Sequence, residues 1–253
     1  MALIEDLDRQ GNFLFRWRSY VPSVILLLSF IYIRDYKYVG GNYETHLLFM
    51  AVCFFVSLLG VLVRALTIGF TPERTSGRNT KKQVADEVNQ TGIYSIWRHP
   101  LYIGNFLIFL GIVMTAFSLS FVLIFVLFYW FYYERIIFTE EQFMRNKFGR
   151  GYLDWADNTP VFFPSFRNYK APRLGFSFRN IIKREYPTLA GAIAAFTIYD
   201  VLIIYYNQPE LWASGWKNLF NIYHAVFFGF GFVFYVLVRA IVKTTKLLHV
   251  EGR

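Results

Sequence analysis

Long uncharged, apolar blocks separated by charged connections are the dominant pattern along this chain. Uncharged runs cover residues 20–33, 46–63, 186–199 and 218–238, and a run of 34 residues covers 100–133. A bilayer core of about 30 Å takes about 20 helical residues to cross, or somewhat fewer with interfacial anchors. Apolar blocks of this length predict transmembrane helices, because an amphipathic soluble helix would place polar residues in every turn.

The run at 100–133 is too long for one span. As a single helix it would extend about 50 Å, at about 1.5 Å per residue, so it must double back. Thr115-Ala116-Phe117-Ser118-Leu119-Ser120 is the expected turn, with arms at 101–114 and 119–138. The predicted fold class is therefore all-α: a polytopic helical membrane protein with about six transmembrane helices, including this helical hairpin.

Composition and charge agree with that interpretation. Of the 253 residues 55% are hydrophobic and 17% charged, against about 45–50% and about 25% in soluble domains. The net charge is +9, and 22 of the 26 Lys and Arg residues lie in alternate connections. Because basic residues accumulate in cytoplasmic loops, both termini are expected in the cytoplasm. We expect an integral protein of a bacterial inner membrane, without a cleavable signal, whose active site faces the cytoplasm.

Two charged stretches on the expected cytoplasmic side contain groups capable of chemistry. The first motif stretch, residues 92–104, reads Gly-Ile-Tyr-Ser-Ile-Trp-Arg-His-Pro-Leu-Tyr-Ile-Gly and runs directly into a span. Pro100 suits the first turn of a helix, whose free amides can hold an anion. His99 and Tyr102 would share a face, and Gly104 would permit close approach of a helix or ligand. Alternatively, these residues only anchor the helix among lipid headgroups.

The second motif stretch, residues 134–164, follows the hairpin. It contains Glu140 and Glu141 where the span ends, then Phe148-Gly149-Arg-Gly-Tyr152, and finally Pro160 and Pro164. Adjacent carboxylates could accept hydrogen bonds from ribose hydroxyls or an amino group. Alone, they would more simply form a solvated face, and Glu134 could pair with Arg135.

Taken in order, the two motif stretches and the intervening hairpin resemble the integral-membrane methyltransferases that include isoprenylcysteine carboxyl methyltransferase and the phospholipid methyltransferases. The resemblance covers residues 91–164. It implies that S-adenosylmethionine binds at the cytoplasmic end of the hairpin. The matching cofactor-binding positions are Tyr94, Arg98, His99, Pro100, Tyr102, Gly104, Glu140, Glu141 and Tyr152. Where the family often has a second tyrosine, this chain has Trp155, which puts a polar contact there in doubt.

The resemblance also divides the chain. Residues 1–90 would form N-terminal spans and a cytoplasmic loop, 91–170 the methyltransferase core, and 171–253 an interfacial segment with two further spans. Methyl transfer from a sulfonium chiefly needs alignment, and an ionised acceptor oxygen needs no base. Arg64, inside a span, and Arg98 are the predicted catalytic residues. The candidate anion holders are Arg64, Arg74, Arg78, Lys81, Lys82 and Arg98.

The predicted function is S-adenosylmethionine-dependent methylation of a membrane lipid, with an anionic headgroup such as a lipid A phosphate favoured. Alternatives are an isoprenylcysteine carboxylate, a phosphatidylethanolamine amine, or a non-enzymatic lipid transporter or binding protein. Basic and aromatic residues alternate in 162–184, but beside a membrane they suit headgroups, so no nucleic acid is expected. No metal site is expected, and His46, Asp200 and His224 are interpreted as structural, with Asp200 and His224 able to hydrogen-bond between spans.

Overall fold

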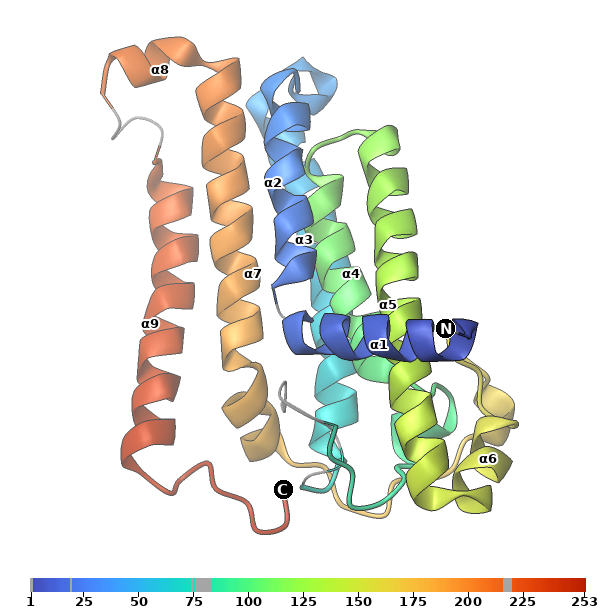
Figure 1. Ribbon diagram of the computed structural model, residues 1–253. Helices are drawn as coiled ribbons and strands as arrows, with labels where there is room; N and C mark the ends of the chain where they lie inside the picture. Colours follow the sequence, from blue (N-terminus) through green and yellow to red (C-terminus); the bar gives the residue numbers. More distant parts are fainter. Residues whose placement is uncertain (1, 19, 74, 76–82, 216–219) are drawn as a thin grey trace.

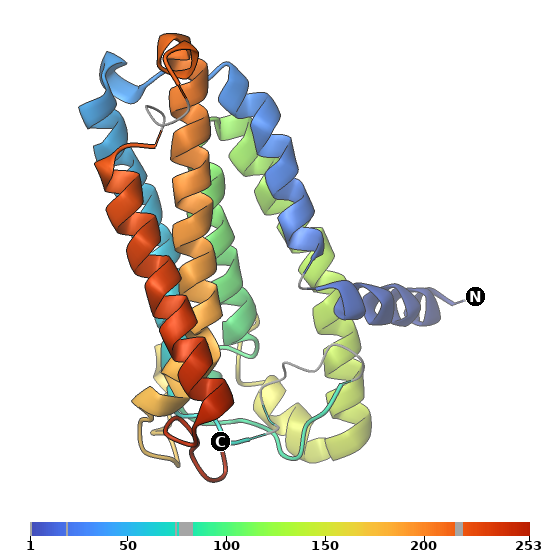
Figure 2. The ribbon, with the colours of Figure 1, turned by 90° about the vertical axis from the view of Figure 1, so that its left-hand side faces the viewer.

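The computed structural model describes residues 2–18, 20–73, 75, 83–215 and 220–253, and these residues form helices and no β-strand. The longer helices of the bundle run side by side (Figures 1 and 2). They are α2 (Val21–Arg34), α3 (Tyr43–Gly69), α4 (Pro100–Met114), α5 (Leu119–Phe148), α7 (Phe178–Asn207) and α9 (Ile222–Thr244). The remaining α-helices are short or lie across the bundle: α1 (Leu3–Trp17), α6 (Arg150–Ala156) and α8 (Pro209–Ala213).

The helices confirm the polytopic helical architecture, but the number of spans needs a correction. By length and apolar composition α3, α5, α7 and α9 can each cross a membrane, and α1 with α2 forms a fifth candidate bent by 73°. The prediction counted six spans. Helix α4 has 15 residues, or about 22 Å, which by length alone falls short of a core of about 30 Å. It nevertheless runs beside α3 and α5 as one arm of the predicted hairpin (Figure 1).

Short 3₁₀ turns occur in three of the connections. These are η1 (Val39–Gly41) between α2 and α3, η2 (Gly92–Ser95) before α4, and η3 (Phe166–Asn168) before α7. We call the end of the bundle with α6 and the C-terminus the α6 end, and the end with α8 the α8 end (Figure 1). Both motif stretches lie at the α6 end, as does the C-terminal tail, where Glu73 N–H bonds to the Gly252 carbonyl at 2.8 Å.

Small residues let α3 and α4 pack backbone against backbone. A Cβ added to Gly60 would lie 2.4 Å from the Gly104 carbonyl oxygen, and one added to Gly111 would lie 2.4 Å from that of Cys53. The Ser57 hydroxyl donates to the Ile108 carbonyl at 2.8 Å across the same contact. Such seams are typical of membrane helices, where close packing replaces the hydrophobic effect. This close contact fixes the position of α4 along the axis of α3, and therefore also the position of the first motif stretch.

Helix α1 crosses the outside of α5 rather than joining the bundle (Figure 2). Gly11 faces α5 so closely that a Cβ there would lie 2.3 Å from the Arg135 carbonyl oxygen. The Tyr132 hydroxyl donates to the Leu14 carbonyl at 3.0 Å, while Leu3 and Phe13 remain exposed. One face of α1 therefore packs against α5, and another face of α1 exposes apolar side chains.

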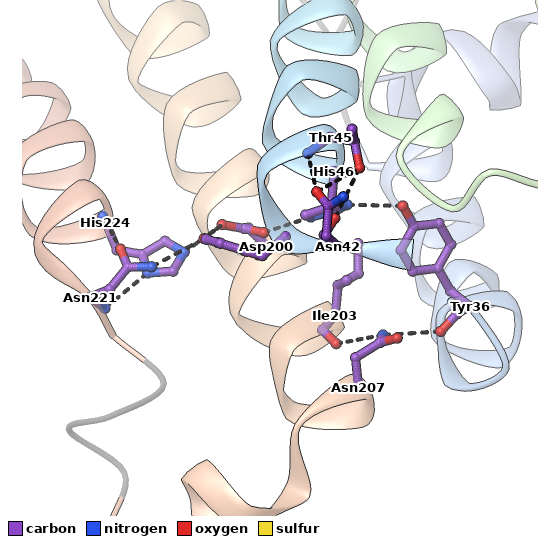
Figure 3. Close-up of polar contacts among 10 residues, drawn as sticks. Tyr36, Asn42, Thr45, His46, Asp200, Ile203, Asn207, Asn221 and His224 are labelled. Carbon is purple, nitrogen blue, oxygen red and sulfur yellow. Dashed lines mark hydrogen bonds and ion pairs between the residues drawn. The ribbon is translucent and has the colours of Figure 1, made fainter. Parts of the chain in front are cut away.

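A buried polar cluster ties three helices together at the α8 end (Figure 3). Asp200 on α7 accepts from His46 on α3 at 2.8 Å and from His224 on α9 at 2.7 Å. The Tyr36 hydroxyl bonds to the other ring nitrogen of His46 at 2.9 Å. A buried carboxylate needs such partners to offset its desolvation. The predicted hydrogen bond between Asp200 and His224 is confirmed, at the end of the bundle away from the motif stretches.

Candidate active site

The two motif stretches are joined just before α4 begins by hydrogen bonds to backbone carbonyls. The Arg98 amide donates to the Pro160 carbonyl at 3.0 Å, and the Trp97 indole donates to the Phe162 carbonyl at 2.9 Å. Pro100 is the first residue of α4, as its lack of an N–H predicts. The segment around Pro160 therefore holds Arg98 and His99 at the start of the helix.

Two adjacent carboxylates at the α6 end of α5 meet the basic pair of the first motif stretch. Glu141 accepts from Arg98 Nη1 at 3.0 Å and lies 3.1 Å from His99 Nε2. Glu140 accepts from the Tyr102 hydroxyl at 2.8 Å, and its carboxylate lies 3.6 Å from His99 Nδ1. Residues about 40 positions apart thus form one charged cluster, because the hairpin brings the start of α4 beside the last turns of α5.

The cluster keeps His99 protonated at neutral pH. Burial on its own lowers the pKa of His99, but the hydrogen bonds and negative charges of Glu140 and Glu141 outweigh it. Together they raise the pKa from 6.5 to about 9. The site therefore holds two cations, Arg98 and His99, directly against two carboxylates.

Beside the cluster lies a cavity of about 610 Å³. This falls in the usual range for a small-molecule site. The predicted site residues that line it are Arg64, Tyr94, Arg98, His99, Pro100, Tyr102, Glu140 and Tyr152. Glu141 is not among the lining residues and instead supports Arg98 and His99. Gly104 is not among them either: it faces α3, where an added Cβ would lie 2.5 Å from Arg64 Cγ.

Two polar atoms in the cavity wall suit a polar ligand. The Tyr152 hydroxyl and Gln83 Nε2 are buried and have no hydrogen-bond partner among the described residues. Buried polar groups are normally satisfied, so a ligand with hydroxyl or amino groups would complete them. Burial raises the pKa of Tyr152, so its hydroxyl stays protonated and can donate. Trp155, where the family often has tyrosine, donates its indole N–H to the Tyr94 carbonyl at 3.2 Å.

Arg64 lines the same cavity and is held by two neighbouring helices. Its Nε and Nη2 donate to the two oxygens of Glu185 on α7, at 2.7 and 2.8 Å. Its Nη1 donates to Asn105 Oδ1 on α4 at 2.5 Å. The charge of Arg64 inside the span is therefore paired with a buried carboxylate. Arg135 and Glu134 also pair, at 2.6 Å.

Sequence reasoning missed several residues of this site and placed others where they cannot be assessed. Arg74, Arg78, Lys81 and Lys82, proposed as anion holders, lie outside the described residues. The missed residues with polar side chains at the cavity or at Arg64 include Arg18, Gln83, Asn105, Arg184 and Glu185. Glu185 could have been found, because an arginine inside a span requires a carboxylate and Glu185 directly precedes an apolar block.

Comparisons with known proteins give evidence on the family of this chain that does not depend on the structure. Residues 50–151 match the phospholipid methyltransferase family. The cobalt-zinc-cadmium resistance protein CzcN of Cupriavidus metallidurans is 32% identical over 164 residues, which are 63% of this chain and 69% of that protein. The nickel-cobalt-cadmium resistance protein NccN of Alcaligenes xylosoxydans xylosoxydans is 29% identical over 116 residues, 46% of this chain and 52% of that protein.

No solved structure gives a significant match. The family match includes the first motif stretch, the hairpin and the carboxylate pair, which are the parts that meet in the charged cluster. The chain therefore belongs to the phospholipid methyltransferase family.

Proposed function

We propose that this protein is an S-adenosylmethionine-dependent membrane methyltransferase that methylates an amphiphile with an anionic headgroup, such as a phosphate of lipid A. One observation carries the proposal: a single cavity is lined both by the family's motif residues and by arginines beside apolar walls. The motif residues would surround a nucleoside cofactor, and the arginines beside apolar walls would surround a lipid headgroup.

The charged cluster would hold the cofactor. Glu140 and the Tyr152 hydroxyl are placed to bind hydroxyl and amino groups, and Arg98 and protonated His99 to bind a carboxylate. Glu141 would keep the two cations in position. When bound, S-adenosylmethionine supplies a methyl group that passes to an acceptor oxygen while the electron pair of the C–S bond returns to sulfur.

The arginines make an anionic acceptor the favoured class. Lining residues with basic side chains are Arg18, Arg64, Arg98, His99 and Arg184, whereas Glu140 is the one acidic residue among the described lining residues. Positive charge positions a phosphate or carboxylate whose oxygen is already ionised. An amine acceptor would first need a base to take its proton. An isoprenylcysteine carboxylate fits the same chemistry, and a phosphatidylethanolamine amine fits it less well.

The apolar part of the wall favours a lipid over a soluble acceptor. Phe109 lies two turns further along α4 than Tyr102, or about 10 Å deeper in the bundle, and both residues line the cavity. Phe15 of α1 and Leu101 add apolar surface. An acyl or prenyl chain could occupy this side while its headgroup meets the arginines. The names of CzcN and NccN refer to metal resistance and specify no acceptor.

A methyl-transfer assay tests the proposal. Purified protein in nanodiscs is incubated with S-adenosylmethionine labelled in its methyl group and a total lipid extract, and we expect label in acidic lipids. Label confined to amine lipids would refute the anionic acceptor, and absence of both transfer and calorimetric cofactor binding would refute the enzyme.

Variants connect the assay to the site. His99→Ala and Glu141→Gln should each raise the cofactor Kd at least about tenfold, because each removes a charge-assisted hydrogen bond worth about 1.5–3 kcal/mol. Glu134→Gln is the matched control, since Glu134 is exposed and pairs with Arg135. Wild-type affinity in either site variant would remove that residue from the cofactor site.

A further inference from the structure

Helix α7 contributes to the cavity although it lies outside the part of the chain that matches the family. The match ends at residue 151, whereas Arg184, Pro187 and Thr188 of α7 line the cavity. They share the wall with Asn105 and Phe109 of α4. This chain's own C-terminal region therefore forms part of the surface that a ligand would meet.

Glu185, next to Arg184 on the same helix, fixes the geometry of Arg64. The Glu185 side chain is 4% exposed, and both its oxygens accept from the Arg64 guanidinium. With the bond to Asn105, three of the five N–H donors of Arg64 have acceptors among the described residues, and the other two can reach a ligand. A guanidinium clamped in this way loses little freedom when it binds an anion, so binding costs less entropy.

Arg184 lines the same cavity as Arg98, His99 and Glu140 of the charged cluster. Burial raises the pKa of Tyr94, while the positive charge of Arg184 lowers it and the negative charge of Glu140 raises it further. Arg64 also lowers the pKa of Tyr94. Tyr94, Glu140 and both arginines line the same cavity, so a ligand there would meet the carboxylate and the arginines together.

We infer that α7 supplies the headgroup subsite for the acceptor: Arg184 binds an anionic oxygen of the headgroup, and Glu185 is a positioning residue that holds Arg64 against the same group. The inference rests on the proposed function and assigns the class of acceptor to residues outside the family match. The shared chemistry is an ionised phosphate or carboxylate attached to a lipid chain.

The test compares Arg184→Gln, Arg184→Lys and Glu185→Gln in the full-length protein, with Arg179→Gln as the control. Arg179 carries the same charge on the same helix but is exposed and does not line the cavity. Three amphiphiles serve as acceptors: phosphatidic acid, a farnesylated N-acetylcysteine and phosphatidylethanolamine. The readouts are cofactor Kd, acceptor KM and kcat, and binding of phosphatidic acid without cofactor.

Arg184→Gln should raise the KM for the preferred anionic acceptor about tenfold or more, with the cofactor Kd unchanged within about twofold. Arg184→Lys should recover part of that loss, because a point charge remains without the bidentate fork. Glu185→Gln should raise KM as well, while a matching thermal unfolding midpoint would show that the protein still folds. The phosphatidic acid and farnesylcysteine arms show whether the headgroup is a phosphate or a carboxylate.

Several outcomes would overturn the subsite. An unchanged acceptor KM in Arg184→Gln would do so, as would an equal rise in Arg179→Gln. A tenfold weaker cofactor Kd with unchanged acceptor KM would move Arg184 to the cofactor site. If wild-type protein bound no cofactor but bound phosphatidic acid in an Arg184-dependent way, the proposed function would fail and the subsite would stand.

Discussion

His99 is the residue at which the two motif stretches meet, and its titration should be visible in stability. The folded-state pKa of about 9 exceeds the unfolded value of 6.5, so the native protein binds the proton more tightly. This contribution is therefore fully present below pH 6.5 and is lost as pH rises through about 9. A rise of that size is worth at most about 3 kcal/mol.

We accordingly predict that the thermal unfolding midpoint in detergent falls between pH 6.5 and 9 in the wild type. In His99→Gln the midpoint should already be low at pH 6.5 and should change less over the same interval. An identical pH dependence in both proteins would show that the charge of His99 is not what holds the two carboxylates.

At the residue scale, the sequence predicted which residues lie together better than it predicted what each of them contacts. The order of Arg98, His99 and the carboxylate pair was enough to bring them together in the prediction. The role of each residue could not be predicted in the same way, because it depends on which residues from distant segments lie beside it. Gly104 faces Arg64 rather than the cavity, and Glu141 supports the cations from behind. A charge inside a span calls for a carboxylate partner, but the residues next to Arg64 do not show that the partner is Glu185, 121 positions away.

At the contact between α3 and α4, the two backbones lie too close for an added methyl group. In Gly60→Ala, the new methyl group would lie 2.4 Å from the Gly104 carbonyl oxygen and 2.8 Å from the Ile108 nitrogen. Backbone atoms cannot move aside cheaply, so we predict a destabilisation of about 1–3 kcal/mol, seen as a lower thermal unfolding midpoint. Because the seam also aligns Arg64 with Asn105, the acceptor KM should rise.

Gly229→Ala on α9 is the matched control for that substitution. It makes the same change inside an apolar helix, but no atom lies within 4 Å of the added methyl group. Alanine favours a helix over glycine by about 1 kcal/mol, so this variant should be neutral or slightly more stable. Equal destabilisation of the two variants would mean that helix packing at Gly60 is not the cause.

At the scale of elements, the apolar blocks predicted positions well and lengths poorly. The hairpin turn falls where expected, since α4 ends at Met114 and α5 begins at Leu119. Helix α5 continues ten residues beyond the predicted arm, because good helix formers such as Glu140 and Met144 extend it past the apolar block. Helix α1 was not predicted at all, since its apolar residues alternate with charges and its position depends on Gly11 contacting α5.

For the molecule as a whole, basic residues and helix ends give a consistent picture. The first and second motif stretches, α6 and the C-terminal tail gather at the α6 end, whereas the buried cluster of Asp200 lies at the α8 end (Figures 1 and 3). The basic connections that follow α6 and α9, at 157–177 and 245–253, therefore lie at the α6 end of the bundle. A bilayer around the bundle would then separate the charged cluster from the connections that carry few basic residues.

That separation can be measured by cysteine labelling, and the same experiment tests whether α4 crosses the membrane. The native Cys53 is buried, with no exposed surface, so it should give little background with an impermeant maleimide. Asp154→Cys and Glu251→Cys at the α6 end should react only from the cytoplasmic side. Lys37→Cys, exposed in the connection between α2 and α3, and Ser120→Cys, exposed in the first turn of α5, should react only from the opposite side. Lack of reaction of Ser120→Cys from either side would mean that α4 enters the bilayer without crossing it. Reaction of Ser120→Cys from the cytoplasm would contradict the predicted orientation, because α5 would then carry Glu140 and Glu141 to the opposite face.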